Sequence, residues 1–97
     1  MSSTKAKRDS ISILAAILRT LTKSGPSKKM GMVYGSNINY ERLGKYLELL
    51  VATGLVELTN SEETLYGITR KGQEFLVGYD RLTESLKITT AYKDPTL

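Results

Sequence analysis

The chain has 97 residues, of which 40% are hydrophobic, and its 14 Lys and Arg against 10 Asp and Glu give a net charge of +4. This length suits one small domain that buries about 60–65% of the surface its unfolded chain exposes. Because Cys and His are both absent, disulfides, zinc sites built on thiolate or imidazole, Ser-His-Asp triads and Cys nucleophiles are excluded.

The first predicted helix follows a short basic segment. Residues 1–8 are polar and basic without periodicity, and we expect them to form a flexible arm. From residue 9 or 10 the apolar residues recur at helical spacing until Gly25-Pro26 stops them. They are Ile11, Leu14, Ala15, Leu18 and Leu21, with Ile13 and Ile17 widening the face. The longest apolar run, residues 13–18, is far short of the roughly 20 residues that span a bilayer, so no membrane association is expected.

Two further helices are predicted in close succession. Ser27 is suited to cap a short second helix that ends at Gly35 or Ser36. Its apolar members are Met30, Val33 and Tyr34. Asn39 is suited to cap a third helix, which Gly54 ends. The buried stripe of this third helix consists of Leu43, Tyr46, Leu47, Leu50 and Val51.

A hairpin and a last helix complete the predicted order. Residues 55–58 and 64–68 alternate in character and are joined by turn-forming residues, which predicts a β-hairpin. Thr69 then caps a helix over about residues 69–88, and residues 89–97 are expected to be a frayed tail. On this helix Phe75, Tyr79, Leu82 and Leu86 follow the 4-3-4 spacing of a short coiled-coil seam. The seam either forms a dimer interface or folds back onto its own subunit.

This order predicts an α+β, mostly helical fold over residues 9–88: a winged helix-turn-helix of three helices, a two-stranded wing and a C-terminal helix. In a helix-turn-helix the later helix, here residues 39–53, enters the major groove with its N-terminal end first.

Three segments carry a family resemblance: NINYERLGKYLELLVATGLVEL, YGITRKGQEFL and SISILAAILRTL. They resemble the archaeal winged-helix DNA-binding regulators related to small chromatin-associated proteins whose last helix forms an antiparallel coiled-coil dimer. The resemblance implies double-stranded DNA binding as a homodimer, in a transcriptional or chromatin role. The wing tip departs from a phosphate-gripping pattern, because it carries Glu62 and Glu63 where Lys or Arg would be expected.

The positive charge gathers in the first third of the chain. Residues 1–29 carry seven Lys or Arg and one Asp, which favours an anionic partner such as phosphate. Lys5, Lys7 and Arg8 suit either the minor groove or a solubilising tail. On the third helix, Arg42 is suited to a guanine edge and Lys45 to a phosphate. The alternative is a solvated face with a Glu41–Lys45 pair.

Other candidate contacts surround this helix. Residues 27–29 open the second helix, where free backbone N–H groups favour an anion, and residues 70–71 lie near the base of the wing. Tyr40 either packs on the second helix alone or also directs its hydroxyl to a phosphate. Gly44 either permits a close approach or is simply tolerated. The residues expected to contact DNA are Ser27, Lys28, Lys29, Asn39, Tyr40, Arg42, Lys45, Arg70 and Lys71.

We therefore expect a dimeric DNA-binding protein of the cytoplasm, associated with the nucleoid, without enzymatic activity, cofactor or metal. The adjacent Glu62 and Glu63 lack the enclosed pocket that acid–base catalysis needs. A specific regulator and a general chromatin protein remain alternatives, since both need phosphate contacts. The rival function is a winged-helix protein–protein adaptor that binds no nucleic acid.

Overall fold

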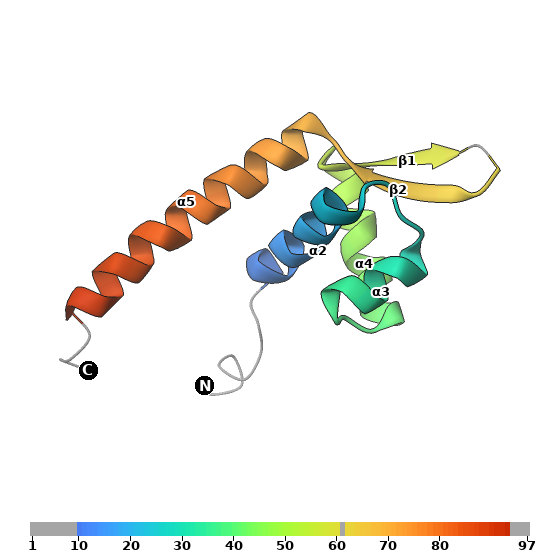
Figure 1. The fold of residues 1–97 in the computed structure, drawn as a ribbon. Helices are drawn as coiled ribbons and strands as arrows, with labels where there is room; N and C mark the ends of the chain where they lie inside the picture. Colours follow the sequence, from blue (N-terminus) through green and yellow to red (C-terminus); the bar gives the residue numbers. More distant parts are fainter. Residues whose placement is uncertain (1–9, 61, 94–97) are drawn as a thin grey trace.

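The computed structural model describes residues 10–60 and 62–93. The predicted basic arm and residues 94–97 of the predicted tail lie outside this range. The elements in chain order are α2 (Ser10–Ser24), α3 (Lys29–Ser36), α4 (Tyr40–Ala52), β1 (Val56–Asn60), β2 (Thr64–Ile68) and α5 (Arg70–Lys93). This arrangement confirms the predicted α+β winged helix-turn-helix, with the hairpin and α5 leaving the helical body in different directions (Figure 1).

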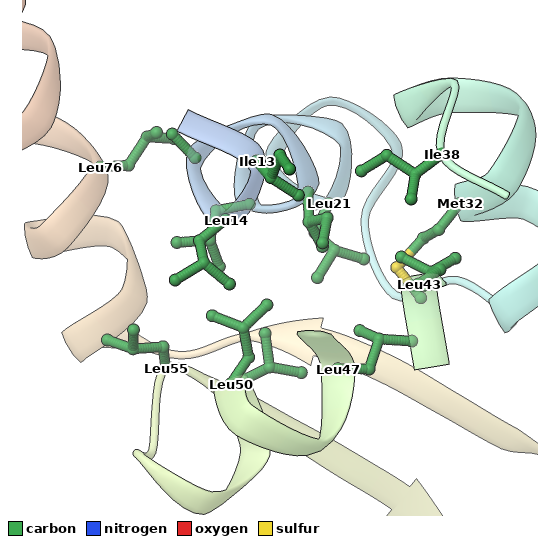
Figure 2. Packing of buried hydrophobic residues seen from close by; sticks show 14 residues of the cluster. Ile13, Leu14, Leu21, Met32, Ile38, Leu43, Leu47, Leu50, Leu55 and Leu76 are labelled. Atoms are coloured by element: carbon green, nitrogen blue, oxygen red, sulfur yellow. The ribbon is translucent and has the colours of Figure 1, made fainter. Parts of the chain in front are cut away.

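Helix α2 supplies the centre of the hydrophobic core, and α3, α4 and α5 surround it (Figure 2). Ile17 and Leu18 are fully buried, and Leu43, Leu47 and Leu50 of α4 close the core from below. The expectation for Ile11 was wrong, because this side chain is 49% exposed. The buried face centres on Ile13 and Ile17, and a residue two positions before Ile13 points to the opposite side of a helix.

The start of α3 differs from the sequence prediction. Lys28, not Ser27, occupies the N-cap position, and it makes no side-chain capping bond. Ser27 is instead extended, and its backbone N–H and C=O exchange hydrogen bonds of 2.9 and 2.8 Å with Tyr66 of β2. Its hydroxyl donates to the carbonyl of Gly25 at 2.8 Å. The predicted capping role of Ser27 is therefore wrong, because this residue extends the edge of the hairpin.

The buried face of α3 was also misassigned. Met32 is fully buried, whereas Met30 is half-exposed and Tyr34 is 79% exposed. Ser36 lies one turn after Met32 on the same buried face, and its hydroxyl donates to the carbonyl of Met32 at 2.6 Å. Val33 packs partly buried against the core, as predicted. The prediction is wrong for Met30 and Tyr34, because the polar Ser36 takes a core position that the apolar pattern does not reveal.

Two predicted caps are confirmed. The Asn39 side chain accepts a hydrogen bond of 2.8 Å from the backbone N–H of Arg42, which fixes the start of α4. The hydroxyl of Thr69 accepts a bond of 3.0 Å from the N–H of Gly72 and donates one of 2.7 Å to the carbonyl of Gly54. Thr69 therefore caps α5 and ties its start to the end of α4.

The hairpin is antiparallel, with paired residues running from Val56 opposite Ile68 to Asn60 opposite Thr64. It confirms the predicted wing.

Helix α5 is longer than predicted. It runs to Lys93, past the end expected at residue 88, so residues 89–93 are helical and not a frayed tail. The first strong helix breaker in this part of the sequence is Pro95, which disfavours the helical conformation in the residue before it. In the described part of the chain, no helix has both the length and the apolar character needed to cross a membrane.

A bidentate ion pair joins α5 to α2. The two guanidinium nitrogens of Arg19 lie 2.9 and 3.2 Å from the carboxylate oxygens of Asp80. The hydrogen bond and the charge of Arg19 hold the pKa of Asp80 below its ordinary value. Beside this pair, Leu76 of α5 is buried in the core.

Candidate nucleic-acid interface

The first two turns of α4 present exposed basic side chains beside a capped helix start. Arg42 and Lys45 are both exposed, while Leu43 and Leu47 on the same turns are buried. Within residues 10–60 and 62–93, neither Arg42 nor Lys45 joins an ion pair, so the alternative Glu41–Lys45 pair does not form. Both cations are therefore available to an external anion.

The side chain of Lys29 crosses from α3 to α4. Its Nζ lies 3.8 Å from the centroid of the Tyr40 ring, which is a cation–π contact. A Cβ atom placed on Gly44 would lie 2.7 Å from the same Nζ. The missing side chain at Gly44 therefore leaves the space that the lysine occupies. Tyr40 packs against α3 through this lysine, as both of its predicted roles require.

Lys28 is joined to the wing. Its Nζ lies 2.8 Å from Oε1 of Glu63, and both side chains are more than half exposed. The hydrogen bond and charge of Glu63 raise the pKa of Lys28. Lys28, which was predicted to bind a phosphate, is thus already paired with a carboxylate. Sequence reasoning missed this pair because it follows from the pairing of Ser27 with Tyr66, which brings the start of α3 to the hairpin.

Arg70 and Lys71 lie away from the front of α4. The Nζ of Lys71 donates a hydrogen bond of 2.8 Å to the carbonyl of Thr53, the residue that ends α4. Arg70 lies 3.7 Å from the Glu74 carboxylate of its own helix. Because α4 has 13 residues and an α-helix rises 1.5 Å per residue, the Lys71 ammonium group is about 20 Å from the N-terminal end of α4. Residues 29, 40, 42 and 45 therefore lie around the first two turns of α4, with Lys29 and Tyr40 on the side that faces the wing and Arg42 on the opposite side. Residues 70 and 71 are not part of this group.

A groove of about 380 Å³ separates α4 from the wing. Its lining includes Lys29, Gly44, Glu48, Val51, Leu58 and Tyr66. Sequence reasoning missed Leu58 and Tyr66. A signal was present, because these two residues are direct cross-strand partners and must share one face of the hairpin.

The residues predicted to form a dimer seam divide into two groups. Phe75 and Tyr79 are partly buried and pack against the core of their own subunit. Leu82 and Leu86 are 59% and 54% exposed, on the part of α5 that extends beyond the helical body (Figure 1). The first half of the seam thus packs on its own subunit, whereas the second half is more than half exposed.

Solved structures with a similar fold include two proteins described as binding DNA, Sso10a-2 and BpsR. The DNA-binding protein Sso10a-2 of Sulfolobus solfataricus matches 92% of this chain and 93% of its own, with 24% sequence identity and a TM-score of 0.81. MarR of Staphylococcus aureus, solved with salicylate and kanamycin, matches 82% of this chain with 23% identity and a TM-score of 0.71. BpsR of Bordetella bronchiseptica matches 88% with 18% identity and a TM-score of 0.70.

This chain covers only 56% of the staphylococcal protein and 62% of the Bordetella protein. No curated protein sequence matches it. A family model for winged helix-turn-helix proteins matches residues 7–87. The chain therefore belongs to the winged helix-turn-helix family, as its motifs predict.

Proposed function

We propose that this protein binds double-stranded DNA as a transcriptional regulator or chromatin-associated protein. One observation carries the proposal. Lys29, Arg42 and Lys45 gather around the first two turns of the later helix of a helix-turn-helix, and none of them joins an ion pair within the described residues. Unpaired cations on both sides of the start of this helix suit the phosphate backbone of a duplex, which dominates affinity for DNA.

The geometry of α4 suggests how the duplex is bound. An α-helix fits the major groove, and in a helix-turn-helix the N-terminal residues of the later helix meet the base edges. In this arrangement Arg42 reaches the edge of a guanine and Lys45 a phosphate. The wing lies beside α4. At its tip Glu63 pairs with Lys28, so neither residue adds a free positive charge to the surface that would approach the duplex.

We further propose that the protein binds DNA as a homodimer through α5. The exposed Leu82 and Leu86 lie one turn apart on a helix that extends beyond the body. A second copy of α5 packed on these side chains would remove both from water. Sso10a-2, the most extensively matched of the three structures described above, is a DNA-binding protein of similar length to this chain, which supports the DNA-binding part of the proposal.

The test is a fluorescence anisotropy titration of a labelled duplex at several salt concentrations. Arg42→Ala and Lys45→Ala are each expected to weaken binding, and Lys45→Ala also to lower the slope of log affinity against log salt by about 0.9 for each protomer bound. Arg81→Ala, which removes one exposed positive charge from α5, is the matched control. Absence of binding at low salt, or equal loss in Arg81→Ala, would contradict the proposal.

The groove beside α4 favours a second candidate, a protein–protein adaptor. Val51 and Leu58 leave apolar surface exposed between α4 and the wing, which suits an apolar partner segment. An adaptor would bind a stoichiometric protein partner, lose that partner on Leu58→Glu, and leave duplex DNA unbound.

A further inference from the structure

Tyr40 and Gly44 together form the site at which the end of the Lys29 side chain packs on α4. They are four residues apart on α4 and therefore lie on the same face of the helix, one turn from each other. The Lys29 Nζ lies 3.8 Å from the Tyr40 ring centroid. The position of a Cβ on Gly44 would be 2.7 Å from this Nζ and 3.5 Å from Cε of the same side chain. The aromatic ring holds the ammonium group, and the glycine leaves room for the end of the side chain.

The ammonium group held there has unused hydrogen-bonding capacity. A lysine ammonium has three N–H donors, and within the part of the chain that the structure describes Lys29 Nζ has neither a hydrogen-bond acceptor nor a carboxylate partner. The neighbouring Lys28 differs, because Glu63 neutralises it. Glu48 lines the same groove as Lys29 without forming an ion pair with it. A half-buried lysine is thus fixed in place with its charge still available.

We propose that Tyr40 and Gly44 are positioning residues that hold the ammonium group of Lys29 against a phosphate of the duplex backbone. The ammonium lies beside the first two turns of α4, between that helix and the wing. A lysine side chain normally loses much rotamer freedom when it binds a phosphate. Because Lys29 is already ordered by the Tyr40 ring and by the space beside Gly44, its binding to a phosphate costs less entropy than that of a free surface lysine. This inference rests on the proposed DNA binding.

The lysine itself is tested with Lys29→Met, which keeps the length of the side chain and removes the charge. We expect affinity for a labelled duplex at low salt to fall about tenfold and the salt slope to fall by about 0.9 for each protomer bound, the loss of one phosphate contact per protomer. Arg81→Met removes one charge from α5 and is the control for net charge. Equal affinity and slope for Lys29→Met and the wild-type chain would overturn the inference.

The positioning role is tested at the two α4 residues. Tyr40→Leu removes the ring and is expected to weaken binding about threefold, and Tyr40→Phe to recover most of that loss. Gly44→Ala is expected to weaken binding by a similar factor without lowering helix content, because alanine favours a helix more than glycine does. In the Lys29→Met background, Tyr40→Leu and Gly44→Ala are expected to have no further effect. If Gly44→Ala still weakens binding there, its methyl group obstructs the DNA directly and the positioning role is wrong.

A measurement without DNA separates this inference from the proposed function. Protons on Cε of Lys29 lie beside the face of the Tyr40 ring and should be shifted upfield in the NMR spectrum of the wild-type chain. The shift should persist in Tyr40→Phe and disappear in Tyr40→Leu. An unshifted Lys29 overturns the positioning even if the protein binds DNA. A shifted Lys29 in a chain that binds no duplex at low salt instead overturns the proposed function and the phosphate contact with it.

Discussion

Lys28 and Glu63 join the start of α3 to the tip of the wing, with 2.8 Å between the lysine Nζ and the carboxylate Oε1. The backbone pairing of Ser27 with Tyr66 brings these two segments together, so the ion pair is an outer extension of the hairpin edge. In the proposed complex a DNA phosphate would compete with Glu63 for the same cation. The acidic wing tip therefore opposes DNA binding locally as well as through its long-range charge.

Removing the Glu63 carboxylate should raise affinity for DNA more than removing its neighbour. Glu63→Gln frees Lys28, whereas Glu62→Gln removes the same charge from the wing tip without breaking an ion pair that the structure describes. Because ion pairs between exposed side chains are weak, we expect an advantage of no more than about fivefold for Glu63→Gln over Glu62→Gln. Anisotropy titrations at equal salt measure it. Equal gains in the two variants would mean that only the net charge matters.

Two glycines of α5 should respond in opposite ways to alanine. A Cβ on Gly72 would run into the carbonyl oxygen of Leu55, which is backbone and has little room to move, whereas a Cβ on Gly78 meets open space. Gly72→Ala should lower the free energy of unfolding by about 1–3 kcal/mol through overpacking. Gly78→Ala should raise it by up to about 1 kcal/mol through helix propensity. Chemical denaturation at one protein concentration distinguishes them, and a stable Gly72→Ala variant would contradict the close approach.

The parts of the fold that the sequence predicted correctly are those with local signals. Asn39 and Thr69 are capping residues within a few positions of the helices they begin, and Gly25-Pro26 ends α2 without help from other elements. Helix α3 has only 8 residues, too few for its period to identify the buried side once a polar residue occupies the core. Its orientation is set by packing against α2 and α4, which the sequence of α3 does not contain.

The candidate site was predictable to a similar degree. Exposed cations on the first turns of α4 follow from helical periodicity, so Arg42 and Lys45 could be identified from their spacing. The different environments of Lys28 and Lys29 could not be predicted from the sequence. The two lysines are adjacent in the chain, but the partner of Lys28 lies on the wing and that of Lys29 on α4. Only the tertiary arrangement decides which lysine is neutralised.

The Arg19–Asp80 pair should make stability depend on pH at the acidic end. Arg19 lowers the pKa of Asp80 below its ordinary value of 3.8. The stabilisation is therefore fully present above that ordinary value and is lost as the pH falls through the lowered pKa. Both side chains are nearly half exposed, so Asp80→Asn should cost no more than about 1 kcal/mol at neutral pH.

Urea denaturation of the wild-type chain and of Asp80→Asn across an acid series measures this contribution. The difference in unfolding free energy between the two proteins should shrink towards zero as Asp80 becomes protonated. Glu84→Gln, which removes another exposed carboxylate of α5, is the control for the general effect of charge. A difference that stays constant through the acid range would show that the ion pair contributes nothing measurable.

The exposed half of the α5 seam should control oligomeric state. Leu82→Glu/Leu86→Glu places two charges where a second α5 would pack. We expect the wild-type chain to sediment as a dimer and the double variant as a monomer in sedimentation equilibrium. Because both side chains are exposed in the single chain, the monomer should keep its helix content. Val77→Glu is the matched control, since Val77 is also exposed but lies about 180° around the helix from Leu86 and outside the seam.

Dimerisation should also change the salt dependence and the affinity of DNA binding. A dimer that places two α4 helices on one duplex neutralises twice as many phosphates as a monomer, so the salt slope of the double variant should fall to about half of the wild-type slope. Affinity should fall with it, because the second α4 no longer binds at the high effective concentration that the dimer provides. A wild-type chain that sediments as a monomer, or a Val77→Glu variant that dissociates equally, would contradict the role of Leu82 and Leu86.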